Sequence, residues 1–179
     1  MSSSLPPEEP QQKPKSPRES QAETTVLMMP SDANPMGNVF GGVILKHVDL
    51  IAGIVARRHA GHGNLVTASI DRMTFLRPVF IGNALVLSAR INYVRRSSME
   101  VEVTVDSEDF DGEGDKKRVR TATAFVTMVA LGREKGGDKK SAALPPLLLE
   151  TDDDRRRFAE GQRRMEARLQ EAGKKSSVS

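Results

Sequence analysis

Hydrophobic and polar positions alternate along two neighbouring segments of the chain. In residues 85–93 every odd position is apolar, and the even positions include Ser88, Arg90 and Asn92. Residues 99–106 repeat the pattern, with Met99 and three valines set against four polar side chains. A period of two with one apolar face indicates half-buried antiparallel strands, and residues 94–98 form a link short enough for a hairpin.

Three further segments are predicted to be strands: residues 24–29, 65–73 and 119–131. The last has small or apolar side chains on both faces, which is typical of a central strand covered on both sides. Glycine and aspartate in residues 110–117 predict a turn between two strands.

The most apolar stretch is VFGGVILKHVDLIAGIVA, residues 39–56. Its length approaches that of a membrane span, but Lys46, His47 and Asp49 lie at its centre. Placing such side chains in the middle of a lipid-facing helix has a high free-energy cost. A helix that is apolar on nearly every side is otherwise a buried helix, and Asn38 is its expected N-cap. One buried helix on an antiparallel sheet predicts the α+β class.

The remaining segments are polar, and they divide the chain. Residues 1–22 are rich in Pro, Ser and Gln and are predicted to be a disordered tail before a domain at 23–134. A linker is expected at 135–149, a charged helix at 150–173 and a disordered end at 174–179. The helix starts with Thr151 and three aspartates, which supply a cap and acidic charge. Three alternatives stay open for it: packing on the domain, mediating assembly, or fraying.

Composition narrows the classes of function. The 179 residues include no cysteine, which excludes disulfides, thiol catalysis and cysteine-ligated metals and fits a reducing compartment. Tryptophan is absent, 4% of residues are aromatic and the net charge is +3, so a nucleic-acid partner is not expected. Three histidines without a ligand pattern predict no metal site. The first residues lack the apolar run of a secretory signal, and they include acidic side chains that a transit peptide would lack. We therefore expect a cytoplasmic protein.

Asp49 is the first candidate for chemistry. An ionisable carboxylate inside an apolar helix is either paired or functional. Its small neighbours Ala52 and Gly53, three and four residues on, leave room for a ligand or a water beside it. The alternatives are a structural ion pair with Lys46, three residues earlier, and burial at a subunit contact.

Asn34 and the pair Gly41-Gly42 precede and begin the helix. Each glycine weakens a helix by about 1 kcal/mol relative to alanine, so some group is expected to approach the backbone closely there. Free N–H groups at a helix start suit an oxyanion or a polarised carbonyl, and close packing of the helix on the sheet is the alternative. Residues 95–98, together with Arg77, either hold phosphates or form a solvated hairpin tip.

The block MPSDANPMGNVFGG at 29–42, continuing to Asp49, resembles the signature of the hotdog-fold acyl-CoA thioesterases. It is most similar to the branch of the hexameric bacterial acyl-CoA thioester hydrolases and the cytosolic brain-type acyl-CoA hydrolase. Further matches at 66–75, 77–78, 96–98 and 121–131 extend the resemblance over about residues 24–132. It implies a long helix wrapped by a curled antiparallel sheet, and dimers that often form hexamers as trimers of dimers, with active sites between protomers.

The resemblance also implies the reaction, hydrolysis of acyl-CoA to a free acid and CoA without a metal, an organic cofactor or a membrane. Asp49 matches the catalytic carboxylate, acting as general base or nucleophile. Asn34 of the facing protomer matches the residue that positions water or substrate, and the Gly42 amide matches the group that polarises the thioester carbonyl. Positions expected to contact the CoA moiety are Gly41, Arg77, Arg96, Ser97 and Ser98.

Two other functions are compatible with the same fold. One is a non-catalytic acyl-CoA-binding module that acts as a sensor. The other is a dehydratase acting on acyl thioesters, which needs a catalytic histidine paired with an acid. His47 is two residues from Asp49 and therefore lies off its helical face, so the dehydratase is disfavoured.

Overall fold

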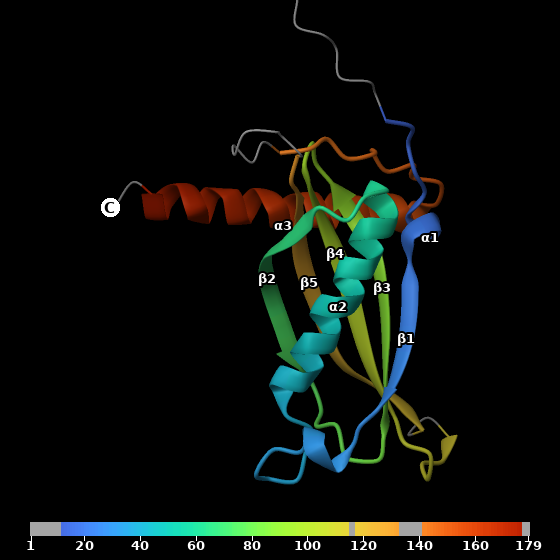
Figure 1. Cartoon of the computed structure of the whole chain (residues 1–179). Coiled ribbons are helices and arrows are strands. Elements are labelled where there is room, and N and C mark those ends of the chain that lie inside the picture. Colours follow the sequence, from blue (N-terminus) through green and yellow to red (C-terminus); the bar gives the residue numbers. More distant parts are fainter. Residues whose placement is uncertain (1–11, 115–116, 133–140, 177–179) are drawn as a thin grey trace, which may run out of the picture.

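The computed structural model describes residues 12–114, 117–132 and 141–176. Within them, five strands form one antiparallel sheet in the order β1-β3-β4-β5-β2 (Figure 1). Strands β1 and β2 are the edges, and the 85–93 and 99–106 patterns fall in the central β3 and β4, joined by the predicted hairpin. The strands are β1 Ala22–Leu27, β2 Leu65–Phe75, β3 Ala84–Val94, β4 Ser98–Glu108 and β5 Arg118–Ala130.

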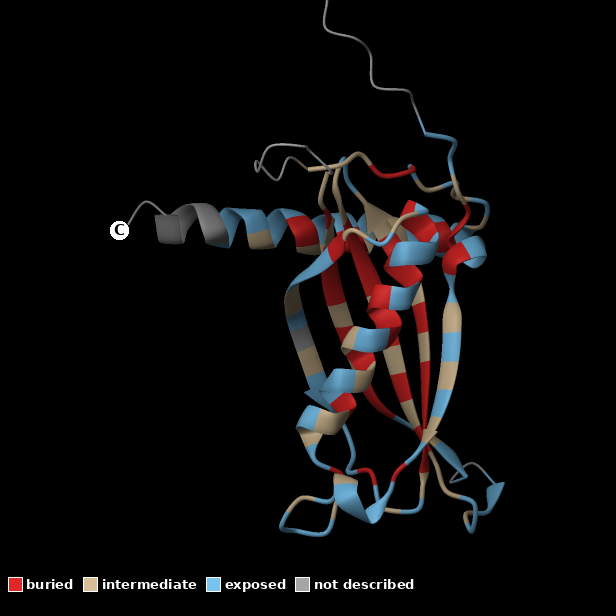
Figure 2. Cartoon of the chain, in the orientation of Figure 1, coloured by how far each residue is buried: buried red, intermediate tan, exposed pale blue. Residues whose placement is uncertain are grey.

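The long helix α2, Gly41–Ala60, lies against one face of this sheet (Figure 1). It ends at Gly61, whose φ of 73° gives the left-handed C-cap that glycine adopts without strain. Figure 2 shows the buried stripe of α2 turned towards the strands. The apolar core between them includes Val48, Ile51 and Val55 of the helix and Leu87, Ile91, Val101 and Val126 of the sheet.

The last helix, α3, Asp152–Ser176, crosses the opposite face of the sheet. Side chains alternate between faces along a strand, so Arg90, Glu100 and Glu102 point away from α2 and towards α3. The predicted cap at Thr151 is confirmed, because Thr151 Oγ1 accepts from the Asp154 N–H at 3.1 Å. Of the three alternatives for this helix, the structure supports packing on the domain.

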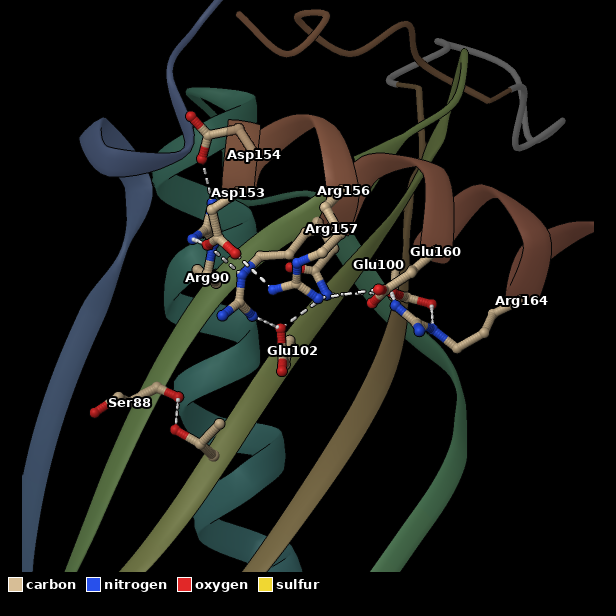
Figure 3. Close-up of polar contacts among 12 residues, drawn as sticks. Ser88, Arg90, Glu100, Glu102, Asp153, Asp154, Arg156, Arg157, Glu160 and Arg164 are labelled. Carbon is tan, nitrogen blue, oxygen red and sulfur yellow. Dashed lines mark hydrogen bonds and ion pairs between the residues drawn. The ribbon is translucent and has the colours of Figure 1, made fainter. Parts of the chain in front are cut away.

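Ion pairs hold α3 on the sheet (Figure 3). Arg164 donates two hydrogen bonds to the fully buried Glu100, at 2.7 and 3.0 Å, and its guanidinium lies 3.9 Å from the centre of the Phe125 ring. Gly161 permits the close approach, because a Cβ there would lie 2.8 Å from Cβ of Tyr93. Hydrogen bonds from Arg157 and Arg156 hold the pKa of Asp153 at about 2, so this carboxylate stays charged in mild acid.

Two extended segments pack beside the C-terminal end of α2. We call residues 12–21 the arm, which contains the short helix α1, Pro17–Ser20, and residues 141–150 the strap. Lys15 pairs with Leu147 in a parallel bridge, and Ser16 Oγ donates to Glu150 at 2.7 Å. His59 of α2 joins both segments, because its Nε2 donates to the Pro145 carbonyl at 2.8 Å and its Nδ1 lies 3.3 Å from Ser20 Oγ.

The polar segments differ from their predicted boundaries. The prediction of disorder up to residue 22 is wrong for 12–22, where Ser16 and Ser20 are buried against the strap and α2. Residues 141–149 of the predicted linker pack as the strap, whereas 1–11 and 133–140 lie outside the described residues. Helix α3 continues to residue 176, and 177–179 lie outside the described residues. Composition did not reveal these contacts because they are made mostly by backbone groups and short hydroxyls.

Replacing Arg164 by Met should strongly destabilise the protein. The substitution leaves the Glu100 carboxylate buried and unpaired, which costs about 3–5 kcal/mol in the free energy of unfolding. Denaturant unfolding measures this loss, and the double variant Glu100→Leu/Arg164→Met should regain most of it. A double variant as unstable as Arg164→Met would show that the ion pair is not the cause.

Acidification should weaken the contact of His59 with the arm and the strap. Burial, the larger cause, lowers the pKa of His59 below its ordinary 6.5, although the hydrogen bond to Pro145 opposes the shift. The unfolded chain therefore binds the proton first, and stability falls as the pH drops from about 6.5 towards the lowered folded-state pKa. Thermal unfolding of wild type and His59→Gln between pH 7.5 and 5 checks this. The midpoints should fall more steeply for wild type, and parallel curves would exclude His59 as the cause.

Candidate active site

The turn before α2 holds Asn34 in a defined conformation. Its side-chain Oδ1 accepts from the N–H groups of Met36 at 2.9 Å and Asn38 at 3.2 Å, the pattern of an Asx turn. Its backbone N–H donates to the Asn38 carbonyl at 2.7 Å, closing the loop. Among the described residues no group accepts from Asn34 Nδ2, so this amide is the part of the side chain left to meet a ligand or a partner.

Helix α2 begins without a side-chain cap. Asn38 is not the N-cap as predicted, because Phe40 occupies that position and Asn38 belongs to the Asx turn. In the described part of the chain no group accepts from the N–H of Gly41 or Gly42. These two donors and the positive end of the helix dipole therefore form a site suited to a carbonyl oxygen that gains negative charge.

Two aromatic rings lie close to the glycine pair and help to explain why glycine occupies these positions. A Cβ on Gly42 would lie 2.5 Å from the Phe40 ring, and a Cβ on Gly41 would lie 3.5 Å from the ring of Phe75. The close approach predicted from the sequence is thus made by two exposed phenylalanines. Packing thus accounts for the absence of a side chain at Gly42, and the amides of both glycines remain without an acceptor among the described residues.

A cavity of about 350 Å³ opens beside the start of α2. Asn34 and Gly41 line it together with Arg77 from the link between β2 and β3. The structure therefore brings three of the predicted site residues to one end of the sheet. Its other walls are mostly apolar: Val39, Ile44, Phe75, Leu76, Pro78 and Val79.

Asp49 lies further along α2, seven residues or about 10 Å of helix rise after Gly42. Its Oδ1 accepts a hydrogen bond from Thr67 Oγ1 of β2 at 2.7 Å. The alternative ion pair with Lys46 is not formed among the described residues. Thr67 was not identified as a candidate from the sequence, because its contact with Asp49 joins a helix and a strand that are separate in sequence. The one sequence feature that could have pointed to Thr67 is its position within the 66–75 match to the family.

The hairpin residues Arg96, Ser97 and Ser98 lie at the opposite end of the sheet from Arg77. They follow β3, whose 11 residues run from the end near the start of α2 to the end near its C-terminus (Figure 1). Arg77 and this hairpin therefore do not meet within one chain, and their predicted joint role in holding phosphates stays a prediction. The free amides and Asn34 lie at the end of the molecule where α2 begins. Asp49 lies part-way along α2, next to Thr67 of β2, and the hairpin lies at the opposite end.

An exposed apolar strip lies along the outer side of α2. Leu45, Leu50 and Ile54 are between 38% and 52% exposed, and Val66 of β2 is 45% exposed. The helix is thus not buried on nearly every side as predicted, because the sheet covers one side of it and the arm and the strap cover only its C-terminal end (Figure 2). Isolated exposed leucines are ordinary, but a strip flanking a carboxylate marks a surface suited to contact.

His47 is a titratable group two residues before Asp49. Burial, followed by the charge of Lys46, lowers the pKa of His47, so its imidazole is neutral at pH 7. Within the residues that the structure describes, no cluster of three or more potential metal ligands occurs. A membrane-crossing helix is likewise not found there, since none is both long and apolar enough.

Comparison with known proteins identifies the family of the chain. Residues 36–111 match the model of the Thioesterase superfamily. The crystal structure of an apo hexameric acyl-CoA thioesterase is 34% identical, with a TM-score of 0.78 over 89% of this chain and 97% of that one. The chain belongs to the thioesterase superfamily. The hotdog fold implied by the resemblance is confirmed.

Two further proteins are similar to this chain. The acyl-CoA hydrolase of Staphylococcus aureus, solved with butyryl-CoA, CoA and CoA disulfide, is 31% identical with a TM-score of 0.79, covering 92% of this chain and 95% of that one. The human cytosolic acyl coenzyme A thioester hydrolase is 41% identical over 115 residues, or 64% of this chain. The match spans 30% of the length of that human relative.

Alanine at Gly41 and at Gly42 should affect stability differently. Both substitutions remove the helix penalty of glycine, up to about 1 kcal/mol. Gly41→Ala makes an ordinary contact with Phe75 and should raise the melting temperature, whereas Gly42→Ala must displace the Phe40 ring and should raise it less or lower it. Thermal unfolding of the two variants compares them directly, and equal gains would show that Phe40 does not constrain Gly42.

Proposed function

We propose that the protein is an acyl-CoA thioesterase that hydrolyses acyl-CoA to a free carboxylic acid and CoA. The observation that carries the proposal is Asp49, a carboxylate on the outer side of α2 held by the Thr67 hydroxyl in a chain of this superfamily. The relatives named as acyl-CoA hydrolases support it. The chemistry needs no metal or organic cofactor, because water, a base and an amide pair suffice.

The proposed reaction forms one C–O bond and breaks one C–S bond. Water attacks the thioester carbon, Asp49 takes its proton as general base, and the carbonyl oxygen gains negative charge beside the amides of Gly41 and Gly42. When the carbonyl re-forms, the C–S bond breaks and the CoA thiolate takes up a proton. Asp49 acting instead as nucleophile forms an anhydride that water then hydrolyses, and the hydrogen bond from Thr67 suits both roles by fixing the carboxylate.

We propose that the site is shared between two copies of the chain. In one copy the Gly42 amide and Asp49 are separated along α2, and Asn34 lies beyond the helix start. A second copy placed antiparallel across the exposed strip of α2 and β2 brings its Asn34 and helix start towards Asp49 of the first. Twofold symmetry then generates two equal sites and covers Leu50 and Ile54. The hexameric relative makes a trimer of such dimers a natural extension.

The same arrangement gives the cationic residues a common role. Arg77 of one copy approaches the end of the other copy that carries Arg96, Ser97 and Ser98. These side chains then bind the phosphates of the CoA nucleotide, with Gly41 near the thioester. A cytoplasmic location fits this substrate, and the human relative is named as cytosolic.

Thiol release from a panel of acyl-CoAs, short to long, tests the activity. Asp49→Ala should lower turnover about 100-fold to 10,000-fold, the usual contribution of a general base, without changing the assembly measured by light scattering. Tight binding without thiol release in the wild type would favour the alternative, a non-catalytic acyl-CoA-binding module. Undiminished turnover in the variant would remove Asp49 from the mechanism.

Mixing two inactive variants tests the shared site. Asp49→Ala and Asn34→Ala should each lose most turnover alone. Co-expressed copies should regain about a quarter of the wild-type rate, because random pairing gives half mixed dimers, each with one intact site. A mixture as inactive as its parents would show that each site lies within one chain.

A further inference from the structure

The hairpin that carries Arg96 is held by a segment distant in sequence. Within the hairpin, the N–H of Arg95 donates to the Ser98 carbonyl at 2.8 Å. The Leu144 N–H of the strap donates to the Arg96 carbonyl at 2.9 Å, and Ala130 of β5 donates to that of Ser97 at 2.8 Å. Backbone groups from two other segments thus fix the tip, unlike a solvated hairpin tip held by its own turn alone.

The Arg96 side chain also has a partner in the strap. Its Nη2 donates to Ser141 Oγ at 2.8 Å. A guanidinium has five N–H donors, so one bond to a hydroxyl leaves most of them available to an anion. Ser141 accepts without bringing a negative charge, and therefore orients Arg96 without neutralising it.

The strap is itself fixed along most of its length. Ala142 donates to the Ala130 carbonyl at 3.1 Å, and Gln12 of the arm donates to that of Ala143 at 3.0 Å. Beyond these, His59 holds the Pro145 carbonyl and Ser16 holds Glu150. Ser141 therefore stands at the end of a segment anchored to β5, to α2 and to the arm.

We propose that Ser141 is a positioning residue for substrate binding: it orients the Arg96 guanidinium towards the phosphates of CoA. This inference rests on the proposed function and adds a residue outside the 24–132 region of resemblance. A free arginine side chain loses rotamer freedom when it binds a phosphate, and a hydroxyl that already restrains it reduces that loss. The effect belongs to binding of the nucleotide, not to cleavage of the thioester.

The experiment compares ligands with and without the nucleotide. Calorimetry gives Kd for CoA and for pantetheine, which lacks the phosphates of the nucleotide, and thiol release gives KM and kcat for acyl-CoA and acyl-pantetheine. Ser141→Ala should raise Kd and KM for the CoA forms about threefold to tenfold, the effect of one hydrogen bond, and leave kcat unchanged. The values for the pantetheine forms should not change, and Ser141→Thr should keep wild-type affinity.

Two controls separate this role from a structural one. Ser88→Ala removes a comparable hydroxyl bond, to Glu23 at 2.8 Å on the α3 side of the sheet, and should change no ligand affinity. Arg96→Ala should weaken CoA binding, and adding Ser141→Ala to it should have no further effect.

The outcomes are distinct for the two proposals. Equal loss for CoA and pantetheine, or no loss for CoA, would overturn the role of Ser141. Additive losses in the double variant would overturn its action through Arg96. A wild type that binds CoA without thiol release would overturn the proposed function alone, because the calorimetric comparison still decides the role of Ser141.

Discussion

The burial of one side of α2 against the sheet is the constraint on which the rest of the structure depends. Val48, Ile51 and Val55 are removed from water on the side of α2 that faces the sheet, and the opposite side of the helix is therefore its outer face. Asp49 lies on this outer face, where its carboxylate meets Thr67 without entering the apolar core. The same packing fixes the helix start, and with it the two amides that the glycines leave free.

The two faces of the sheet are covered by different physical means. On the α2 side the driving force is the removal of apolar surface from water. On the α3 side Glu100 is buried as an ion, which is tolerated because Arg164 supplies two hydrogen bonds and rests on Phe125. The apolar face sets the architecture. The ionic face selects one position for α3, since Arg157, Arg164 and Arg168 each pair with a carboxylate of the sheet.

The proposed sharing of the site between two copies follows from where its residues lie in one chain. Asn34 and the free amides of the glycine pair lie at the start of α2, whereas Asp49 lies further along the helix. In the proposed dimer, an antiparallel copy places one helix start beside the carboxylate of the other helix. The exposed strip of α2 would then serve both assembly and catalysis in that proposal.

Local patterns in the sequence determined the main elements, because periodicity and turn residues act between near neighbours. The alternation at 85–93, the apolar run before Ala56 and the position of Asp49 within it were readable for this reason. Tertiary structure alone decided which residues meet: Thr67 on Asp49, Ser141 on Arg96, and the arm on His59. These contacts join residues 18, 45 and 39 positions apart, and neither composition nor period encodes such pairs. The physical reason is that chain reversals and sheet order, not local propensity, bring them together.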